Sequence, residues 1–258
     1  TFRSLKAPVI SGNGRIAFIG TIAGGSVTKE SNTVVVSSGR TGALEVLARE
    51  GSAAPETGGA VYRSFASVSI QGTDESGTIF RGILRRGSGT PQVDLKSDSA
   101  AWWQPAGEAA VQLLVREGEI GTSASETIRT FQVLRATSGS AGQGRGQTGG
   151  ASALIQVGLS TGAKAQVLAT PGNLAKIAST GDLLGGEALP DAAWARMNVP
   201  SSGSDGTNIS VLGALKSRVG GVLGTEAKGI FASADSGQTW EPVVRTSSIA
   251  PGFGGLAT

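Results

Sequence analysis

The segment FASADSGQTW (231–240) contains a compact set of residues that could do chemistry. Its skeleton is Ser-x-Asp-x-Gly-x-Thr-Trp, formed by Ser233, Asp235, Gly237, Thr239 and Trp240. A carboxylate between two hydroxyls belongs either to an active site or to a turn. Apolar, β-prone residues flank the segment, and Asp, Ser, Gly and Gln are typical turn residues. The sequence therefore predicts a hairpin in which Asp235 accepts backbone hydrogen bonds, Gly237 supplies a positive φ and Trp240 packs into a sheet.

Three arginines form a second candidate site. Arg3, Arg63 and Arg129 occupy one position in the related segments FRS, YRS and IRT, at spacings of 60 and 66 residues. If these segments repeat around an axis, three guanidiniums could hold a carboxylate, a phosphate or an acidic partner loop through bidentate hydrogen bonds. The alternative is that each arginine pairs with a local acid such as Glu50 or Glu117. We favour this alternative, because equivalent residues of a repeat usually serve the repeat itself.

The composition argues against several kinds of site. The chain has no His and no Cys, so it lacks the commonest general base and the commonest ligands of transition metals. Asp74 and Glu75 could hold a hard cation, but a solvated turn is the favoured interpretation. We expect no metal and no cofactor. The net charge is only +3 and the arginines are dispersed, which argues against nucleic-acid binding. No segment has the length of a membrane span.

The elements that must position these residues recur along the chain. One segment aligns on Leu5, Phe65, Phe131 and Trp194, and its copies are FRSLKAPVI (2–10), YRSFASVSI (62–70), IRTFQVLRA (128–136) and DAAWARMNV (191–199). A middle strand follows at 14–22, 77–84 and 206–215. No middle strand is placed in the third repeat, where 138–151 is mostly Gly, Ser and Gln. We expect that repeat to be the weakest, with a shortened or irregular middle strand.

The second recurring segment is a hairpin of two apolar strands, at 32–51, 100–118, 152–172 and 229–247. Each repeat then has four strands. A β-propeller is built from four-stranded sheets arranged around a central axis. The sequence predicts one all-β domain, a β-propeller of about four four-stranded repeats near 1–59, 60–124, 125–187 and 188–258. These form a closed four-bladed ring or an arc of a larger one. A short helix candidate, 173–186, is expected as an insertion.

Two resemblances accompany this pattern. The skeleton Ser233 to Trp240 resembles the Asp-box, the BNR repeat of sialidase-like β-propellers, where it is a fold element remote from the catalytic centre. The segments APVISGNGRIAFIGTI (7–22), VLAREGSAAPETGG (46–59) and LLVREGEIG (113–121) resemble repeats of large, mostly uncharacterised secreted or surface proteins of bacteria. In later repeats Thr170-Pro171-Gly172 and Arg245-Thr246 replace Arg-Glu-Gly. The resemblance implies a propeller-like fold, an extracellular, cell-surface or periplasmic location, and no established activity.

The sialidase-like family uses a Tyr nucleophile, and this chain has a single Tyr. Tyr62 aligns with the apolar residues Phe2 and Ile128, which favours core packing. A glycosidase needs only two carboxylates, and nineteen acidic residues leave that pair open. We therefore expect a non-enzymatic binding or scaffold module with no catalytic residues. It would be a secreted or surface bacterial protein, or an accessory subunit of a larger assembly, that binds protein or carbohydrate through a propeller face. The alternative is a sialidase-like or other glycoside hydrolase.

Overall fold

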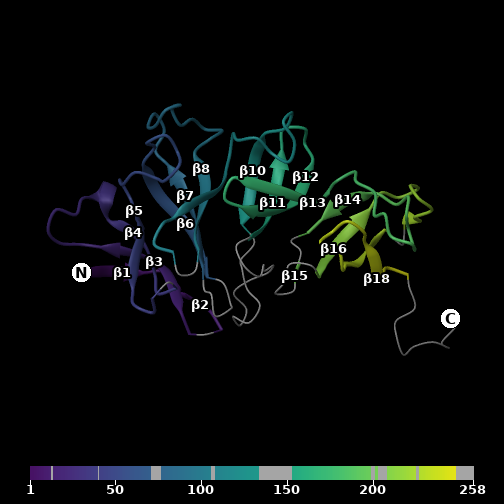
Figure 1. Cartoon of the computed structure of the whole chain (residues 1–258), viewed down its shortest axis with the longest axis horizontal. Helices are drawn as coiled ribbons and strands as arrows, with labels where there is room; N and C mark the ends of the chain where they lie inside the picture. The colour runs from purple at the N-terminus through teal and green to yellow at the C-terminus, as the bar shows by residue number, and fades with distance from the viewer. Residues whose placement is uncertain are drawn as a thin grey trace.

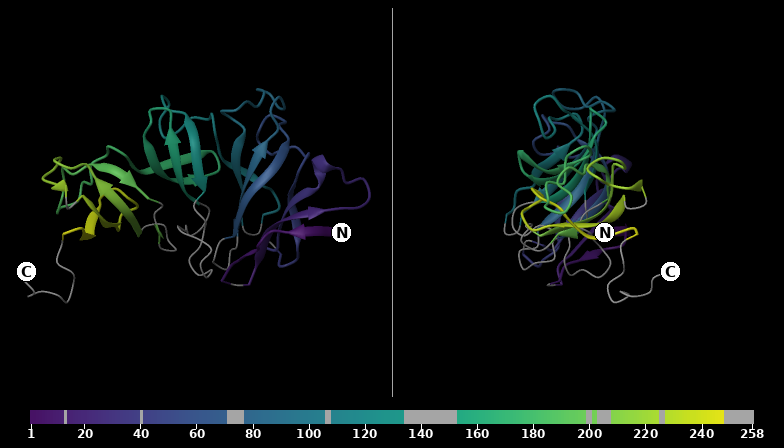
Figure 2. Two further views of the ribbon diagram at one scale, coloured as in Figure 1. Left: turned by 180° about the vertical axis from the view of Figure 1, so that it is seen from behind. Right: turned by 90° about the vertical axis from the view of Figure 1, so that its right-hand side faces the viewer.

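Four antiparallel sheets follow one another along the chain in the computed structural model, which describes residues 1–12, 14–39, 41–70, 77–105, 108–133, 153–198, 201–202, 208–224 and 227–247. The sheets lie side by side in an arc, with the first sheet at one end and the fourth at the other (Figure 1). The view from behind gives the same order (Figure 2). The predicted all-β architecture of four four-stranded repeats is confirmed, and the sheets form an open propeller arc rather than a closed ring.

The four main strands of each sheet are hydrogen-bonded in the order in which they occur in the sequence. The first sheet contains β1 (Phe2–Leu5), β3 (Ile16–Ile22), β4 (Thr33–Ser37) and β5 (Glu45–Arg49), with β2 (Val9–Ile10) beside β3 and the short 3-10 helix η1 (Lys29–Ser31) before β4. The second contains β6 (Tyr62–Ile70), β7 (Thr78–Leu84), β8 (Ser99–Gln104) and β9 (Gln112–Arg116). The third contains β10 (Ile128–Val133), β11 (Ala153–Leu159), β12 (Lys164–Thr170) and β13 (Asn173–Ser179). The fourth contains β14 (Trp194–Met197), β16 (Ile209–Leu215), β17 (Lys228–Ser233) and β18 (Glu241–Arg245), with β15 (Ser201–Ser202) beside β16.

The third sheet differs from the prediction. The segment 152–172 supplies the second and third strands, β11 and β12, rather than the last two. The fourth strand is β13, so the helix candidate at 173–186 is wrong. The segment 138–151, on which the expectation of a weak middle strand rested, lies outside the described residues. The second strand of this sheet is β11, which has seven residues, as β3, β7 and β16 do. A tight turn at Pro171-Gly172 reverses the chain, so that β13 runs antiparallel to β12. The main-chain hydrogen bonds between β13 and the edge of β12 outweigh the local preference of this segment for a helix.

Apolar clusters fill the space between consecutive sheets, because alternate residues of each strand face opposite sides. We call the face of each sheet toward the following sheet its downstream face, and the other its upstream face. Downstream residues of the first sheet, such as Val35, pack on upstream residues of the second, such as Trp102. The same arrangement joins the second sheet to the third and the third to the fourth. Each pair of consecutive sheets therefore shares an apolar core.

The first strands align by their pairing. Phe2, Tyr62, Ile128 and Trp194 lie opposite the last residue of the second strand in their sheets, namely Ile22, Leu84, Leu159 and Leu215. Trp194 therefore corresponds to Tyr62, and the predicted alignment of Trp194 with Phe65 is wrong. The residue that corresponds to Phe65 is Met197, which lies opposite Gly213 as Phe65 lies opposite Gly82. Aromatic side chains cover these glycines and leave no room for a Cβ.

Main-chain hydrogen bonds join each sheet to the next. The amides of Gly51, Gly118 and Gly181 donate to the carbonyls of Tyr62, Ile128 and Trp194, each at 2.8 Å. All three glycines have a positive φ, which a residue with a Cβ rarely adopts. The counterpart of Glu117-Gly118 in the third repeat is thus Thr180-Gly181, and not the turn at 170–172.

Candidate functional site

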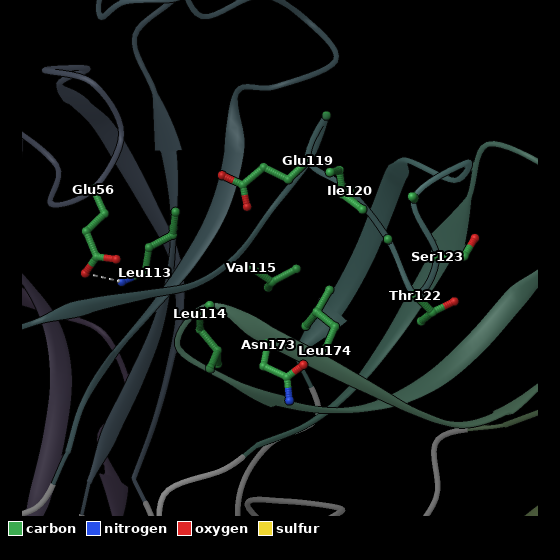
Figure 3. Close-up of a pocket in the computed structure, with 14 residues that line it drawn as sticks. Glu56, Leu113, Leu114, Val115, Glu119, Ile120, Thr122, Ser123, Asn173 and Leu174 are labelled. Atoms are coloured by element: carbon green, nitrogen blue, oxygen red, sulfur yellow. Dashed lines mark hydrogen bonds between the residues drawn. The ribbon is translucent and has the colours of Figure 1, made fainter.

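A groove of about 810 Å³ lies between the second and third sheets (Figure 3). Three segments form it: the edge strand β9, the linker 118–124 that follows it, and the turn between β12 and β13. Glu56, from the linker between the first and second sheets, lies at one end (Figure 3). The repeat architecture thus brings together residues that are far apart in the sequence.

Glu56 is fixed by its linker. Its φ is 59°, an unusual value for a residue other than glycine. The carboxylate Oε1 of Glu56 accepts a hydrogen bond from the amide of Leu113 in β9, at 3.2 Å. The preceding carbonyl, of Pro55, accepts a 3.1 Å hydrogen bond from the indole of buried Trp102. A side chain held in this way presents its carboxylate with little loss of conformational freedom on binding.

Glu119 is the second carboxylate of the groove. It is exposed at the rim, but neighbouring protein atoms desolvate its carboxylate and raise its pKa. Arg116 opposes this shift, and the charge of Glu56 adds to it. The carboxylate of Glu119 points toward the end of the groove where Glu56 lies (Figure 3). A smaller cavity, of about 360 Å³, also has Glu56 and Glu119 in its lining.

The rest of the groove has both apolar and polar lining residues. Its side-chain lining comprises Leu113, Leu114, Val115, Ile120 and Leu174, with Thr122, Ser123 and Asn173 as polar residues. The hydroxyls of Thr122 and Ser123 already donate to Glu126, at 3.0 and 3.1 Å. The lining contains two carboxylates and no Lys or Arg. The groove therefore favours a ligand with positive charge or with many hydrogen-bond donors, and disfavours an anion.

The residues 233–240 lie elsewhere, in the turn between β17 and β18. Asp235 Oδ1 accepts hydrogen bonds from the hydroxyl of Ser233 at 2.6 Å and the amide of Thr239 at 3.0 Å, and Oδ2 accepts one from the Thr239 hydroxyl at 2.6 Å. The pKa of Asp235 is about 2, because these hydrogen bonds outweigh the effect of desolvation. Gly237 has a φ of 88°, and Trp240 is buried. The carboxylate is thus occupied within its own turn.

Arg3, Arg63 and Arg129 are all exposed. Each is the extra residue of a β-bulge at the start of its sheet's first strand, and the equivalent bulge of the fourth sheet has Ala195. In the described part of the chain none of the three arginines has an ion pair with an acid such as Glu50 or Glu117. Anion binding by these arginines stays a prediction.

The neighbouring arginines have a structural role. Arg49 and Arg116 donate from Nε to the carbonyls of Ser31 and Ser97, at 2.7 and 3.0 Å. These equivalent contacts fix the segment before the third strand in the first and second sheets. Glu117 is buried, which raises its pKa, while Arg81 lowers it and Asp98 raises it. Both arginines are therefore engaged with the main chain.

Tyr62 packs in the core as predicted. Its ring contacts those of Phe65, Phe80 and Trp102, with centroid distances from 4.8 to 6.1 Å. Its hydroxyl is buried without a hydrogen-bond partner, and burial raises its pKa. A nucleophilic Tyr needs access to substrate and an activating base. The single Tyr of the chain has neither.

Sequence reasoning missed Glu56 and Glu119. The signal was their place in the linkers that follow the two Arg-Glu-Gly segments: Glu56 lies five residues after Gly51, and Glu119 directly follows Gly118. Asp74 and Glu75 lie outside the described residues. Within the part of the chain that the structure describes, no group of His, Cys, Asp or Glu could hold a metal ion. No described helix is long and apolar enough to cross a membrane.

Comparison with known proteins gives a family match and distant structural likeness. The model of DUF7453, a family of unknown function, matches residues 1–192. No curated protein matches the sequence. Similar solved structures include Trypanosoma rangeli sialidase, with 9% identity and a TM-score of 0.43, and its complex with the inhibitor DANA, with 11% identity and a TM-score of 0.42. Each match covers 93% of this chain and 38% of the sialidase chain, so this chain spans well under half the length of those proteins.

Proposed function

The chain belongs to DUF7453, a family of unknown function, and we propose that it is a binding module whose groove holds a basic segment of a partner protein. The observation that carries this proposal is that Glu56 and Glu119 line one groove, together with apolar side chains and without any Lys or Arg. A Lys or Arg side chain has an apolar stem and a charged head. Its stem would lie on leucines such as Leu113, and its head would bind the carboxylates.

The overall charge sharpens the test. Because the chain has a net charge of +3, it repels a basic peptide in general, so binding of such a peptide reports a local acidic site. The probes are fluorescein-labelled oligolysine and oligoarginine peptides, and the measurement is fluorescence anisotropy. Glu56→Gln and Glu119→Gln should each weaken binding about tenfold, because each removes one charge-assisted contact.

Glu108→Gln is the matched control, since Glu108 is exposed and lies outside the groove. It should leave the affinity unchanged. Equal losses in all three variants would mean diffuse electrostatic attraction, and would overturn the groove as the site. Thermal unfolding of each variant verifies that the fold is retained.

A second candidate function rests on the raised pKa of Glu119. A desolvated carboxyl with a raised pKa holds its proton at a higher pH than an ordinary glutamate, as a general acid requires, and Glu56 in the same groove supplies the second carboxylate of a glycoside hydrolase. The acidic lining then favours neutral glycosides over sialic acids. Turnover of neutral 4-nitrophenyl glycosides that is lost in Glu119→Gln would support this function. If the chain binds basic peptides but does not hydrolyse these glycosides, the hydrolase is excluded and the binding module remains the proposed function.

The proposal includes a secreted or cell-surface location, or a place in a larger extracellular assembly. Its support is the likeness of 46–59 and 113–121 to repeats of secreted bacterial proteins. Fractionation of the native host with an antibody tests it. Recovery in the cytoplasm alone would contradict it.

A further inference from the structure

A smaller groove, of about 200 Å³, lies between the third and fourth sheets. We call it the second groove, and the groove of Glu56 and Glu119 the first groove. The same three elements form both: the last strand of one sheet, the linker after it, and the turn before the last strand of the next sheet. In the second groove these are β13, the linker residues Asp182 and Leu183, and the turn between β17 and β18.

Main-chain hydrogen bonds place Asp182 where Glu119 lies in the first groove. The carbonyl of Glu119 accepts a hydrogen bond from the amide of Ile128, at 2.9 Å. The carbonyl of Asp182 accepts one from the amide of Trp194, at 3.0 Å. Ile128 and Trp194 occupy the same position in the first strands of their sheets. The acidic residue that follows the linker glycine is therefore repeated in the second groove.

The last strands β9 and β13 align by their pairing as well. Each has a bulge at the same place, and Leu113 and Lys176 lie just before it. Leu113 is opposite the fourth residue of β8, and Lys176 is opposite the fourth residue of β12. Both residues line their grooves. The second groove thus has a lysine where the first groove has a leucine.

Lys176 supplies the positive charge that the first groove lacks. Its Nζ lies 3.1 Å from Oδ2 and 3.4 Å from Oδ1 of Asp182. Among the residues that the structure describes, Glu119 forms no ion pair. The side chains of Lys176 and Asp182 are 45% and 36% exposed, and an exposed ion pair of this kind contributes little free energy. A competing cation can therefore displace Lys176 from Asp182.

We infer that the second groove is a further binding site for a basic segment, and that Lys176 occupies this site within the chain itself. The ion pair of Lys176 with Asp182 has the chemistry proposed above for a ligand lysine beside Glu119, so this site rests on the proposed function. Trp240 and Leu183 line the second groove and offer apolar surface to the stem of a Lys or Arg. Removal of Lys176 should open the site.

The probe is the fluorescein-labelled oligolysine peptide, and the measurement is fluorescence anisotropy. The background chain carries Glu56→Gln and Glu119→Gln, which weaken the first groove. In this background Lys176→Met should raise the affinity about fivefold, because it removes an exposed ion pair that competes with the probe. Addition of Asp182→Asn should cancel the gain. The matched control is Lys228→Met, since Lys228 is exposed and lines neither groove, and it should leave the affinity unchanged.

The outcomes separate this site from the proposed function. If the unaltered chain binds oligolysine through the first groove but Lys176→Met gives no gain in the background chain, the second site is overturned and the proposed function stands. If the unaltered chain does not bind, a gain in Lys176→Met that Asp182→Asn cancels supports the second site alone. Equal gains in Lys176→Met and Lys228→Met would mean a general effect of net charge and would overturn the site. Thermal unfolding verifies the fold, and Lys176→Gln replaces Lys176→Met if that variant unfolds.

Discussion

The indole rings of Trp194 and Trp240 lie perpendicular to each other, with their centroids 5.6 Å apart. Trp194 begins β14, and Trp240 ends the turn after β17. The indole of Trp240 donates to the carbonyl of Gly237, and its amide donates to the carbonyl of Leu184, both at 3.0 Å. The turn is thus tied to the first strand of its own sheet and to the preceding linker, so changes in it should affect stability.

Asp235→Ala should lower the free energy of unfolding by about 1–3 kcal/mol, because it leaves the Thr239 amide and two hydroxyls without their acceptor. Urea unfolding at neutral pH measures the loss. Asp235→Asn keeps one acceptor oxygen and should lose less. Equal stability of the Ala variant and the unaltered chain would show that solvent satisfies these donors.

The same carboxylate predicts an acid-sensitive contribution to stability. The pKa of Asp235 is about 2 in the folded chain, below its unfolded value of about 3.9. A lowered pKa stabilises the fold above the unfolded value, and this contribution is lost as pH falls through the folded value. The stability difference between the unaltered chain and Asp235→Asn should be constant above about pH 5 and shrink between about pH 4 and pH 2. A difference that grows with acidity would contradict the assignment.

Gly237→Ala should destabilise the chain more than Gly162→Ala. Both glycines have a φ of 88°, so both variants include the cost of a left-handed alanine, about 1–2 kcal/mol. A Cβ at Gly162 meets no atom within 4 Å, whereas one at Gly237 overlaps Cγ2 of Ile177. Thermal unfolding should therefore show an additional loss of about 1–3 kcal/mol at Gly237. Equal losses would mean that Ile177 moves aside freely.

Tyr62→Phe should leave the stability unchanged or raise it by up to about 1 kcal/mol. The variant keeps the ring packing and removes a buried hydroxyl that has no hydrogen-bond partner. Tyr62→Ala removes the ring as well and should cost about 3–5 kcal/mol. Chemical unfolding measures both variants. A loss in Tyr62→Phe would show that the hydroxyl has a partner in solution.

Binding of basic peptides should weaken as pH falls. Because the pKa of Glu119 is raised, its carboxylate gains a proton at a higher pH than an ordinary glutamate, whose pKa is about 4.3. The affinity should begin to drop above that value, and Glu119→Gln should remove this part of the pH dependence. Anisotropy titrations over a pH series measure the effect. A profile identical in both proteins would exclude Glu119 from the site.

The sequence predicted the repeats wherever a large apolar residue marked the first strand. Leu5, Phe65 and Phe131 occupy equivalent positions, as aligned. The alignment slipped at Trp194, because the fourth repeat has its largest side chain three residues earlier and a Met at the marker position. The local sequence shows that a residue is apolar, but the position of that residue in the sheet is fixed only by the pairing of its strand with the neighbouring strand.

The third repeat and the groove were harder to predict for a related reason. The strands β11 and β12 resemble the last hairpin of the other repeats, and the Gly-rich segment before them gave no marker for their order. The groove joins Glu56, Glu119 and Asn173, which come from three separate connections. Their proximity follows from the stacking of sheets, which no short segment of sequence contains.

The main-chain hydrogen bonds that three glycines form to the next sheet have an evolutionary consequence. The bonds from Gly51, Gly118 and Gly181 to the next repeat use main-chain atoms only, and the accepting residue is Tyr, Ile or Trp. Such a hydrogen bond requires glycine as the donor but sets no requirement on the side chain of the accepting residue. A repeat that is copied by duplication within its gene can therefore attach to any predecessor before its own side chains have adapted, and a family of such chains can vary in repeat number more readily than in repeat structure.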